Sequence, residues 1–423
     1  MSFESAYNYK AYKEYRKLKQ DWKVLYKGIN LVDVCAVDLI DALVVGKEAD
    51  CYHIVCALLK RLKIEPLLTA FASHKNVFTF DVVNRRDHLE LSHAIAESVD
   101  DNAWVQLKYY YSPLRAICRF FVFLKKVIHL QTSFLNRAFI AARMAGYSCI
   151  VDDMDKKLIK QDWANKRYIP FCASAYTEAL LTVYLRNKGV KTFATMHGFF
   201  GRYLNVIAND IVNGENILTD YILTFGETQR QDLIRDFQIN PQRIKVAGNP
   251  KYTSLPNSIK NTFQSCLILG GIGLYDEDIR QFLPIAEHIA KEKGIRFALK
   301  PHPLSNIQRD DIWNEIKHVK LLSQSQTIKQ LFESGEYDFV ITHNTFSYYE
   351  SMIFGLKPFR WARNENLDFD GLDDRFVTEQ ELIAKIQLAK ETNQEMLTIQ
   401  IKDILTKVLG AEINHYNIII NNV

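Results

Sequence analysis

The chain has 423 residues, about the length of two α/β domains and too long for a single ordinary core. Apolar residues make up 48% and charged residues 24%, which excludes a disordered chain. The 53 basic and 49 acidic side chains give a net charge of +4, which is too small to indicate nucleic-acid binding.

The seven cysteines are an odd number without metal-ligand spacing, which predicts buried thiols in a reducing compartment. The N-terminal stretch is rich in Lys and Tyr and lacks the apolar core of a signal peptide. No segment reaches the roughly 18 continuous apolar residues of a membrane-spanning helix. We therefore expect a cytoplasmic protein, with peripheral attachment to the inner face of the cell membrane as the alternative.

The first part of the chain, before about Gly146, is mostly helical in pattern. Its most unusual segment, residues 108–143, contains Lys, Arg and several aromatic residues but no Asp or Glu. This composition predicts a helical insertion that lies on an anionic membrane surface, where each nearby basic residue contributes about 1 kcal/mol. A domain helix with solvated cations is the equally weighted alternative.

Beyond this segment, β-like runs and helical patterns alternate. In the first half we expect strands at 148–151, 168–172, 191–195, 220–225 and 243–247, and helices at 176–188 and 227–237. The segment 248–258 is rich in turn formers and separates the halves, so we place an N-terminal acceptor-side domain at 1–250 and a C-terminal donor-binding domain at 251–423.

The second half alternates more regularly. We expect strands at 266–269, 295–299, 319–322, 337–342 and 357–361, and helices at 276–293, 307–316, 328–333 and 345–354. This order predicts an α/β fold with a parallel, doubly wound, Rossmann-like sheet. A helix at 394–409 and the chain end 414–423 follow, and the sequence does not decide which domain they pack against.

Two polar clusters follow strands of the second half. Lys300 and His302 flank a proline, which makes their turn rigid. The second cluster follows the strand expected at 337–342 and consists of Asn344, Thr345, Ser347 and Glu350. Asn344 or Thr345 is the expected helix cap. Because ligands bind at the carboxyl edge of open α/β sheets, we expect Lys300, His302 and the amide and hydroxyl donors to share one phosphate-binding pocket. Glu350 is expected to accept hydrogen bonds from sugar hydroxyls. The alternatives are a charged surface turn, a well-capped helix and, for Glu350, an ordinary first-turn charge.

A glycine-rich turn, which includes Gly271, follows the first strand of the second half and permits close approach of a ligand. It lacks the spacing and acidic partner of a dinucleotide fingerprint, and the chain has no Gly-Lys-Ser/Thr phosphate loop. ATP hydrolysis therefore has little support.

Candidate bases lie in the first half. His197 ends the strand at 191–195, and if the two domains face one another it points at the cleft. Asp152 and Asp153 follow the strand expected at 148–151 and are competing candidates for the base, at another strand end. The alternative for these acids is a solvated acidic turn.

Five short motifs in this order resemble bacterial two-domain glycosyltransferases of the GT-B fold, which build capsule, lipopolysaccharide or teichoic-acid-like surface glycans. The motifs are His197-Gly198, Phe225-Gly226-Glu227, Gly248-Asn249-Pro250, Lys300-Pro301-His302-Pro303, and the Thr/Asn/Ser cluster that ends in Glu350. The resemblance covers 168–361. It implies two Rossmann-like domains that face a central cleft.

The resemblance also implies the chemistry: transfer of a sugar from a nucleotide-activated donor to a glycan or lipid-linked acceptor. We expect Lys300, His302 and the helix start at Asn344 and Thr345 to offset the negative charge on the departing phosphate, so that the reaction needs no metal and no cofactor. The nucleotide, CMP, UDP or CDP, stays open. His302 would bind the nucleotide or its phosphate, with Thr345 and Ser347 nearby. His197 would be the base, or an aspartate of the Asp152-Asp153 pair in a sialyltransferase-like alignment.

Three other functions share this pattern. A nucleotide-sugar epimerase of the same fold would need the same phosphate site. A CDP-polyol phosphotransferase is weakened because Met196 and Phe346 depart from that group's pattern. The third is a catalytically inactive scaffold of an assembly complex.

Overall fold

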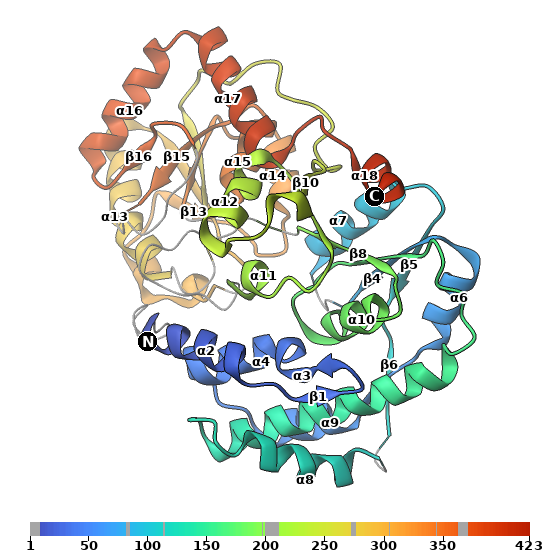
Figure 1. Cartoon of the computed structure of the whole chain (residues 1–423). Coiled ribbons are helices and arrows are strands. Elements are labelled where there is room, and N and C mark those ends of the chain that lie inside the picture. Colours follow the sequence, from blue (N-terminus) through green and yellow to red (C-terminus); the bar gives the residue numbers. More distant parts are fainter. Residues whose placement is uncertain are drawn as a thin grey trace. The chain divides into compact units, whose positions relative to one another are not determined.

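The computed structural model describes residues 9–81, 85–112, 115–196, 198, 211–271, 276–303, 305–343, 345–362 and 371–423 (Figure 1). The chain forms two compact units. The first unit is Met1–Lys251 together with Asn414–Val423, and the second unit is Tyr252–Ile413. Each unit contains its own six-stranded sheet.

The sheet of the first unit is entirely parallel, with the order β10-β9-β8-β7-β4-β5. Numbered along the chain, this order reads 2-1-3-4-5-6 from β5, so the direction of winding reverses between β4 and β7. The strands are β4 (Asn76–Phe80), β5 (Asn102–Gln106), β7 (Arg167–Pro170), β8 (Lys191–Thr195), β9 (Tyr221–Thr224) and β10 (Ile244–Val246).

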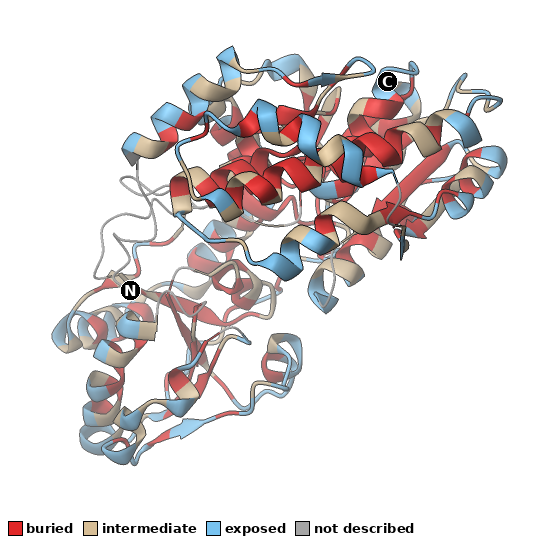
Figure 2. Ribbon diagram, turned by 90° about the horizontal axis from the view of Figure 1, so that it is seen from below, coloured by how far each residue is buried: buried red, intermediate tan, exposed pale blue. Residues whose placement is uncertain are grey.

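Helices and short turns surround this sheet, and its central strands are buried (Figure 2). All five residues of β4 are buried, as is typical of a strand covered on both faces. The helices are α2 (Tyr9–Asp21), α3 (Leu31–Val34), α4 (Ala36–Ile40), a π-helical turn (Asp41–Val45), α6 (Glu65–Ser73), α7 (Arg86–Glu97), α10 (Tyr176–Arg186), α11 (Val212–Glu215), α12 (Glu227–Phe237) and a 3-10 turn (Pro241–Arg243). A two-stranded hairpin joins β1 (Leu25–Tyr26) and β2 (Ile29–Asn30).

An additional layer of the first unit contains the segment expected as a helical insertion near 108–143. A second small antiparallel sheet pairs β3 (Lys60–Leu62) with β6 (Tyr109–Tyr111). Beside it, α9 (Phe134–Lys157) packs against α5 (Cys51–Leu59) and α8 (Ala116–Val127). At Gly146 the approach of α5 is so close that a Cβ would lie 2.3 Å from the carbonyl oxygen of Ala57.

The strand expected at 148–151 is wrong, because these residues lie inside α9. From Ala145 to Val151 every side chain is buried, so the segment lacks the polar face that marks an amphipathic helix. A short, fully buried apolar run has the same pattern in a helix as in a strand. The other strands and helices expected between 168 and 247 are confirmed, with boundaries that differ by up to two residues.

The sheet of the second unit is also parallel, with the order β13-β12-β11-β14-β15-β16. Numbered along the chain it reads 3-2-1-4-5-6, the Rossmann order, with the reversal between β11 and β14. The strands are β11 (Ser265–Leu269), β12 (Arg296–Lys300), β13 (Val319–Leu321), β14 (Phe339–Thr342), β15 (Lys357–Trp361) and β16 (Arg375–Phe376).

The helices of the second unit are α13 (Asp276–Lys293), α14 (Ile328–Glu333), α15 (Ser347–Ile353), α16 (Glu379–Glu391) and α17 (Gln394–Leu409). The helix expected at 307–316 is wrong. Two 3-10 turns, Ile307–Arg309 and Asp311–Asn314, replace it. Asp310 separates them because its backbone is extended and its side chain accepts the N–H of Ile312.

The chain end returns to the first unit, although the expected donor domain extended to residue 423. Helix α18 (Tyr416–Asn422) lies in the first unit, and the Tyr416 hydroxyl donates to the carbonyl of Gly248 at 3.1 Å. The N–H of His415 donates to the carbonyl of Ala247 at 2.8 Å. The first unit is therefore built from both ends of the sequence.

Two doubly wound, Rossmann-like units in one chain are the components of the GT-B architecture, so the predicted fold class is confirmed. Among the helices in the described parts of the chain, none combines the length and the apolar character needed to cross a membrane.

A substitution in α18 tests its docking. Tyr416 is fully buried, so Tyr416→Ala is expected to lower the free energy of unfolding by about 3–5 kcal/mol, as for other buried aromatic truncations. Tyr416→Phe loses only the hydrogen bond from the hydroxyl to Gly248 and should lower the free energy of unfolding by about 1 kcal/mol. Urea unfolding followed by circular dichroism measures both. The matched control is Ile418→Ala on the exposed face of the same helix, and equal losses for Ala at both positions would contradict the docking.

Candidate functional site

Three adjacent strands of the second unit end at the same level of the sheet. The register pairs Leu269 of β11 with Lys300 of β12 on one side and with Thr342 of β14 on the other. Gly270 and Gly271 therefore lie between the turn after β12 and the cluster after β14. This edge contains the point where the strand order reverses, which is where open α/β sheets bind ligands. The structure thus brings Gly271, Lys300, His302, Thr345 and Ser347 to one edge, while Asn344 lies outside the described residues.

The ammonium group of Lys300 is turned into its own loop. The residue is 4% exposed, and its Nζ donates to the carbonyls of Pro301 at 2.8 Å and Gln324 at 3.2 Å. Burial lowers the pKa of this group. Lys300 was expected to face a phosphate, but in this arrangement it holds together the turn that carries His302.

Gln324, which the sequence analysis did not single out, supports the same turn. Its side-chain amide donates to the carbonyls of His302 at 3.0 Å and Ser305 at 3.2 Å. On the other side, the N–H of Gly270 donates to the carbonyl of Lys300 at 3.1 Å. The signal that marks Gln324 is its place three residues after the end of β13, at the same carboxyl edge. His302 therefore lies on a turn that is tied to both neighbouring strand ends.

The cluster after β14 is linked to the start of the second unit. The Ser347 hydroxyl donates to one carboxylate oxygen of Glu350 at 3.2 Å, and the Tyr252 hydroxyl donates to the other. The expected cap at Thr345 is wrong, because α15 begins after Phe346 and has no side-chain cap. Thr345 accepts the N–H of Ser347 only at 3.4 Å. Its hydroxyl is therefore at the sheet edge without the capping role.

His343 is a second residue that the sequence analysis did not single out for a role. It is buried, with Nδ1 2.7 Å from the carbonyl oxygen of Trp361 and Nε2 3.3 Å from the Asp278 carboxylate. The Trp361 indole N–H donates to the carbonyl of Asp278 at 3.0 Å. His343 thus connects the start of α13 to the ends of β14 and β15. A histidine directly after a buried strand was the available signal.

On the first unit, His197 lies outside the described residues, whereas Gly198 is described. The carbonyl of Gly198 accepts a hydrogen bond from the Gln229 amide at 2.8 Å. The carbonyl oxygen of the same amide accepts the N–H of Phe225, directly after β9, at 2.8 Å. Gln229 therefore holds the position after His197 at the carboxyl edge of this sheet.

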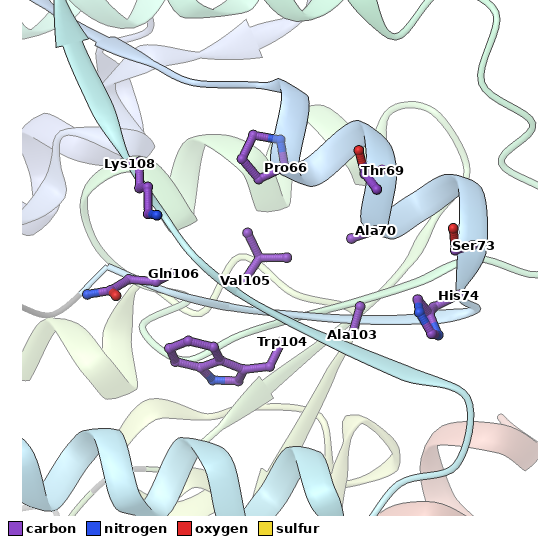
Figure 3. A pocket seen from close by; sticks show the side chains of 10 residues that line it. All are labelled: Pro66, Thr69, Ala70, Ser73, His74, Ala103, Trp104, Val105, Gln106 and Lys108. Atoms are coloured by element: carbon purple, nitrogen blue, oxygen red, sulfur yellow. The ribbon is translucent and has the colours of Figure 1, made fainter.

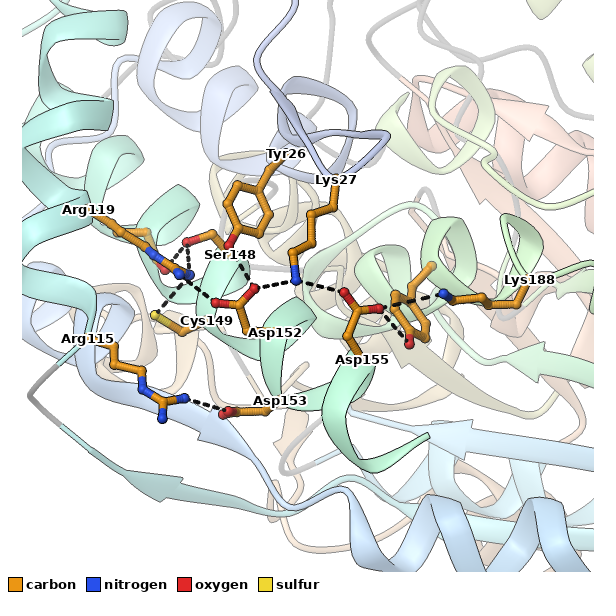
Figure 4. A network of polar contacts seen from close by, with 12 residues as sticks. Tyr26, Lys27, Arg115, Arg119, Ser148, Cys149, Asp152, Asp153, Asp155 and Lys188 are labelled. Atoms are coloured by element: carbon orange, nitrogen blue, oxygen red, sulfur yellow. Dashed lines mark hydrogen bonds and ion pairs between the residues drawn. The ribbon is translucent and has the colours of Figure 1, made fainter. Parts of the chain in front are cut away.

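Asp152 and Asp153 are not at a strand end, because they belong to α9. Figure 4 shows Lys27 between Asp152 and Asp155, with 2.8 Å from its Nζ to a carboxylate oxygen of each, and Arg115 3.4 Å from Asp153. Burial alone would raise the pKa of Asp152, but hydrogen bonds from Lys27, Arg119 and Tyr26 hold it at about 2. A carboxylate with so low a pKa is a weak general base near neutrality.

These acids also lie away from the carboxyl edge. Asp155 accepts a hydrogen bond from Tyr184, near the last residue of α10, at 3.2 Å. Helix α10 begins at the carboxyl edge, and Thr177 in its first turn lies about 10 Å from Tyr184 at 1.5 Å per residue. The expected position of Asp153 at a sheet edge is therefore wrong, and its role as a base stays a prediction without this geometric support.

Two other acids, which the sequence analysis missed, do lie at the reversal point of the first sheet. Glu178 is 0% exposed and accepts the Thr79 hydroxyl of β4 at 2.6 Å and the N–H groups of Phe171 and Cys172, after β7, at 3.0 and 2.9 Å. Burial, together with the charge of Asp81, raises the pKa of Glu178 to about 8. Glu178 thus joins the two strands between which the winding reverses.

Asp81 directly follows β4. The N–H and the hydroxyl of Thr177 are directed at its carboxylate, the Thr177 hydroxyl accepts the Tyr109 hydroxyl at 2.9 Å, and burial raises the pKa of the Asp81 carboxyl. An acid immediately after a buried apolar run was the sequence signal for Asp81. Glu178 gave none, because it lies among the apolar residues of a regular helix.

A groove of 580 Å³ lies between α6 and the edge strand β5 (Figure 3). Its walls include Pro66 and Thr69 of α6, and Trp104 and Gln106 of β5. None of the predicted site residues that the structure describes lines it. Across the described ranges of both units, no group of three or more His, Cys, Asp or Glu residues has the arrangement of a metal site.

The Glu178 carboxyl predicts a pH dependence of stability. Its pKa is about 8 in the native protein against an ordinary 4.5, so its stabilisation is complete below pH 4.5 and is lost as the pH rises through about 8. The free energy of unfolding should fall by up to about 1.4 kcal/mol per pH unit in this window. Glu178→Gln should remove this slope, as measured by urea unfolding between these pH values.

The control for this experiment is Glu97→Gln, which changes an exposed acid of the same unit and should leave the slope intact. Equal slopes in the parent protein and in Glu178→Gln would show that Glu178 is ionised in the native state.

Comparisons with known proteins give the following result. No protein-family profile matches the chain, and no curated protein sequence matches it. Similar solved structures include the UDP-GlcNAc 2-epimerase from Methanocaldococcus jannaschii, with 10% identity, coverage of 76% of this chain and 94% of that chain, and a TM-score of 0.46.

The wall teichoic acid polymerase TagF has 13% identity, coverage of 83% and 88%, and a TM-score of 0.43. TarM has 13% identity and a TM-score of 0.41, and the match covers 64% of this chain. The chain spans only 55% of the length of TarM. At these identities and TM-scores, the fold assignment rests on the two sheet topologies described above.

Proposed function

We propose that this protein is a glycosyltransferase that moves a sugar from a nucleotide-activated donor to a glycan or lipid-linked acceptor in bacterial surface polysaccharide synthesis. The observation that carries the proposal is the meeting of the predicted donor residues at the reversal point of a 3-2-1-4-5-6 sheet. Three strand ends contribute to that edge: a glycine turn, the His302 turn and the hydroxyl cluster.

In the proposed reaction the second unit binds the nucleotide and its departing phosphate. The glycine turn lets the backbone approach the ligand. His302, on a turn held by Lys300 and Gln324, donates a hydrogen bond to the phosphate as negative charge develops on it, and the Thr345 hydroxyl is the second donor. The Ser347 hydroxyl donates to Glu350 and orients that carboxylate. Glu350 accepts a hydroxyl of the donor sugar. We extend the proposal to a reaction that needs no divalent metal and no cofactor.

A specific surface supports attachment of the enzyme to the inner face of the cell membrane. On α8, the side chains of Phe121 and Val122 are 58% and 55% exposed, beside the exposed Lys125 and Lys126. Figure 1 shows α8 as the outermost helix of the insertion beside α9. A helix that exposes apolar and basic residues together matches an anionic lipid surface, on which a lipid-linked acceptor would lie.

The donor site is tested by two histidine variants. Thermal unfolding with CMP, CDP, UDP, GDP and TDP should identify one nucleotide that stabilises the protein, by about 2.7 kcal/mol at a hundredfold excess over Kd. His302→Ala should raise the Kd for that nucleotide at least about tenfold, because the substitution removes a hydrogen bond to a charged group. His197→Ala should retain nucleotide binding and lose transfer at least about a hundredfold, as expected for a base.

The control is His288→Ala, an exposed histidine of the second unit, which should leave both properties unchanged. Transfer by the parent protein should persist in EDTA. Full transfer by both His197→Ala and His302→Ala would overturn the assignment. Conversion of the free nucleotide sugar to an epimer in the absence of acceptor would identify an epimerase instead.

The membrane surface is tested by vesicle flotation. The double change Phe121→Ser with Val122→Ser should abolish binding to vesicles of phosphatidylcholine with phosphatidylglycerol, because it removes the apolar face that enters the interface. Lys125→Ala with Lys126→Ala should weaken binding by about 1 kcal/mol per residue and only on the anionic vesicles. Leu388→Ser, at an exposed apolar position of α16, is the control. Equal flotation of the parent protein and the Phe121/Val122 variant would refute a role for α8.

A further inference from the structure

We propose that the open edge of β5 is a dimerisation surface, along which β5 of one copy of this chain pairs antiparallel with β5 of a second copy. The contact joins the six-stranded sheets of two first units into one continuous sheet. It involves the first unit alone and does not depend on the proposed function.

The backbone of β5 presents hydrogen-bonding groups at the edge of the sheet. Strand β5 pairs with β4 on one side, and within the described residues no strand pairs with its other side. The N–H of Asn76 donates to the carbonyl of Asp101 at 3.1 Å, at the start of β5. At its end, the N–H of Leu107 donates to the carbonyl of Phe80 at 3.0 Å. Odd-numbered residues thus bond to β4, and since these groups alternate along a strand, the N–H and C=O groups of the even-numbered residues point to the open side. The even-numbered residues are Asn102, Trp104 and Gln106.

Strand β5 lacks the features that protect the other sheet edges of this chain. The other edge strands of the two large sheets, β10, β13 and β16, have three, three and two residues. Each of them contains a basic residue, which is Lys245, Lys320 or Arg375. Strand β5 has five residues, and none of them is charged or a proline. Short length and charge are common means by which proteins prevent pairing at an edge, so β5 is the edge that remains suited to it.

The groove of 580 Å³ between α6 and β5 shows that this edge is accessible (Figure 3). Consecutive residues of β5, from Ala103 to Gln106, line the groove. Because the side chains of consecutive residues point to opposite faces of a sheet, a groove that touches all of them runs along the edge of the strand. Its lining contains no residue of any helix or strand other than α6 and β5. An added strand would lie about 4.8 Å from β5, on this open side.

The charges at the two ends of β5 favour a second, antiparallel copy as the occupant. Asp100 and Lys108 lie four residues before and four residues after Trp104, and both are exposed. Asp100 accepts a hydrogen bond from the Asn417 amide at 2.7 Å, and within the described residues neither Asp100 nor Lys108 belongs to an ion pair. In an antiparallel pair centred on Trp104, Lys108 of each copy lies at the strand end that carries Asp100 of the other copy. The two-fold symmetry therefore creates two attractive contacts between opposite charges.

The same register pairs the backbone groups that point to the open side. Asn102 of each copy lies opposite Gln106 of the other, and the two copies of Trp104 lie opposite one another. Residues paired in this way exchange N–H and C=O hydrogen bonds across an antiparallel pair. The side chain of Trp104 is already fixed, because its ring stacks on His93 with 4.0 Å between centroids and its indole N–H donates to Ser92 at 2.9 Å. Pairing therefore requires little additional ordering of the strand.

Sedimentation velocity of the full chain over a range of concentrations tests the contact, and the parent protein should sediment as a dimer. Gln106→Pro removes an N–H that bonds to the second copy and leaves the bonds to β4 intact, since these come from the odd-numbered residues. By symmetry the dimer loses two hydrogen bonds, so its Kd should rise at least about tenfold. Gln106→Ala keeps the N–H and is the matched control, with an unchanged Kd. Circular dichroism confirms that each variant is folded.

Charge reversal tests the antiparallel register. Asp100→Lys and Lys108→Glu should each raise the Kd at least about tenfold, because each places like charges together twice in the dimer. An equimolar mixture of these two variants should dimerise again, since every contact in the mixed dimer joins opposite charges. Lys245→Glu, on the edge strand β10, is the control and should leave the dimer unchanged. A monomeric parent protein, a dimer that Gln106→Pro and both charge variants leave intact, or a mixture that stays monomeric would overturn the inference.

Discussion

The arrangement of both units depends on the connectivity of parallel strands. Each connection must cross back over a face of the sheet, so all strands end at the same edge. At that edge neighbouring loops pack against one another, except where the order of the strands reverses and the two loops leave in opposite directions. One such point lies between β11 and β14, and another between β4 and β7. The predicted donor residues after β11, β12 and β14 meet at the first of these points, although they are far apart in the sequence.

Much of this arrangement was predictable from the sequence where strands and amphipathic helices alternate. The strands from β7 onward, and the edge that collects Gly271, His302, Thr345 and Ser347, follow from hydrophobic runs and their polar ends. The first part of the chain was less predictable. Helix α9 has no polar stripe over Ala145–Val151, so its pattern carried no sign of a helix.

The direction in which side chains point was a second property that could not be predicted from the sequence. The sequence gives a cation at Lys300, but only the structure shows that the aliphatic stem folds back and places the ammonium on two carbonyls. Glu178 is the opposite case. Nothing in an apolar helix marks a glutamate that reaches across to two strands, because its partners are backbone groups set by the tertiary fold. Asp81 could have been found from its place directly after a buried run.

The return of α18 to the first unit makes that unit discontinuous in the chain. During synthesis on a ribosome, residues 252–413 emerge before α18, so the second unit can be completed while the first unit still lacks this helix. Domains usually fold in the order of their synthesis. Here the unit that starts earlier in the chain is the one that is completed later.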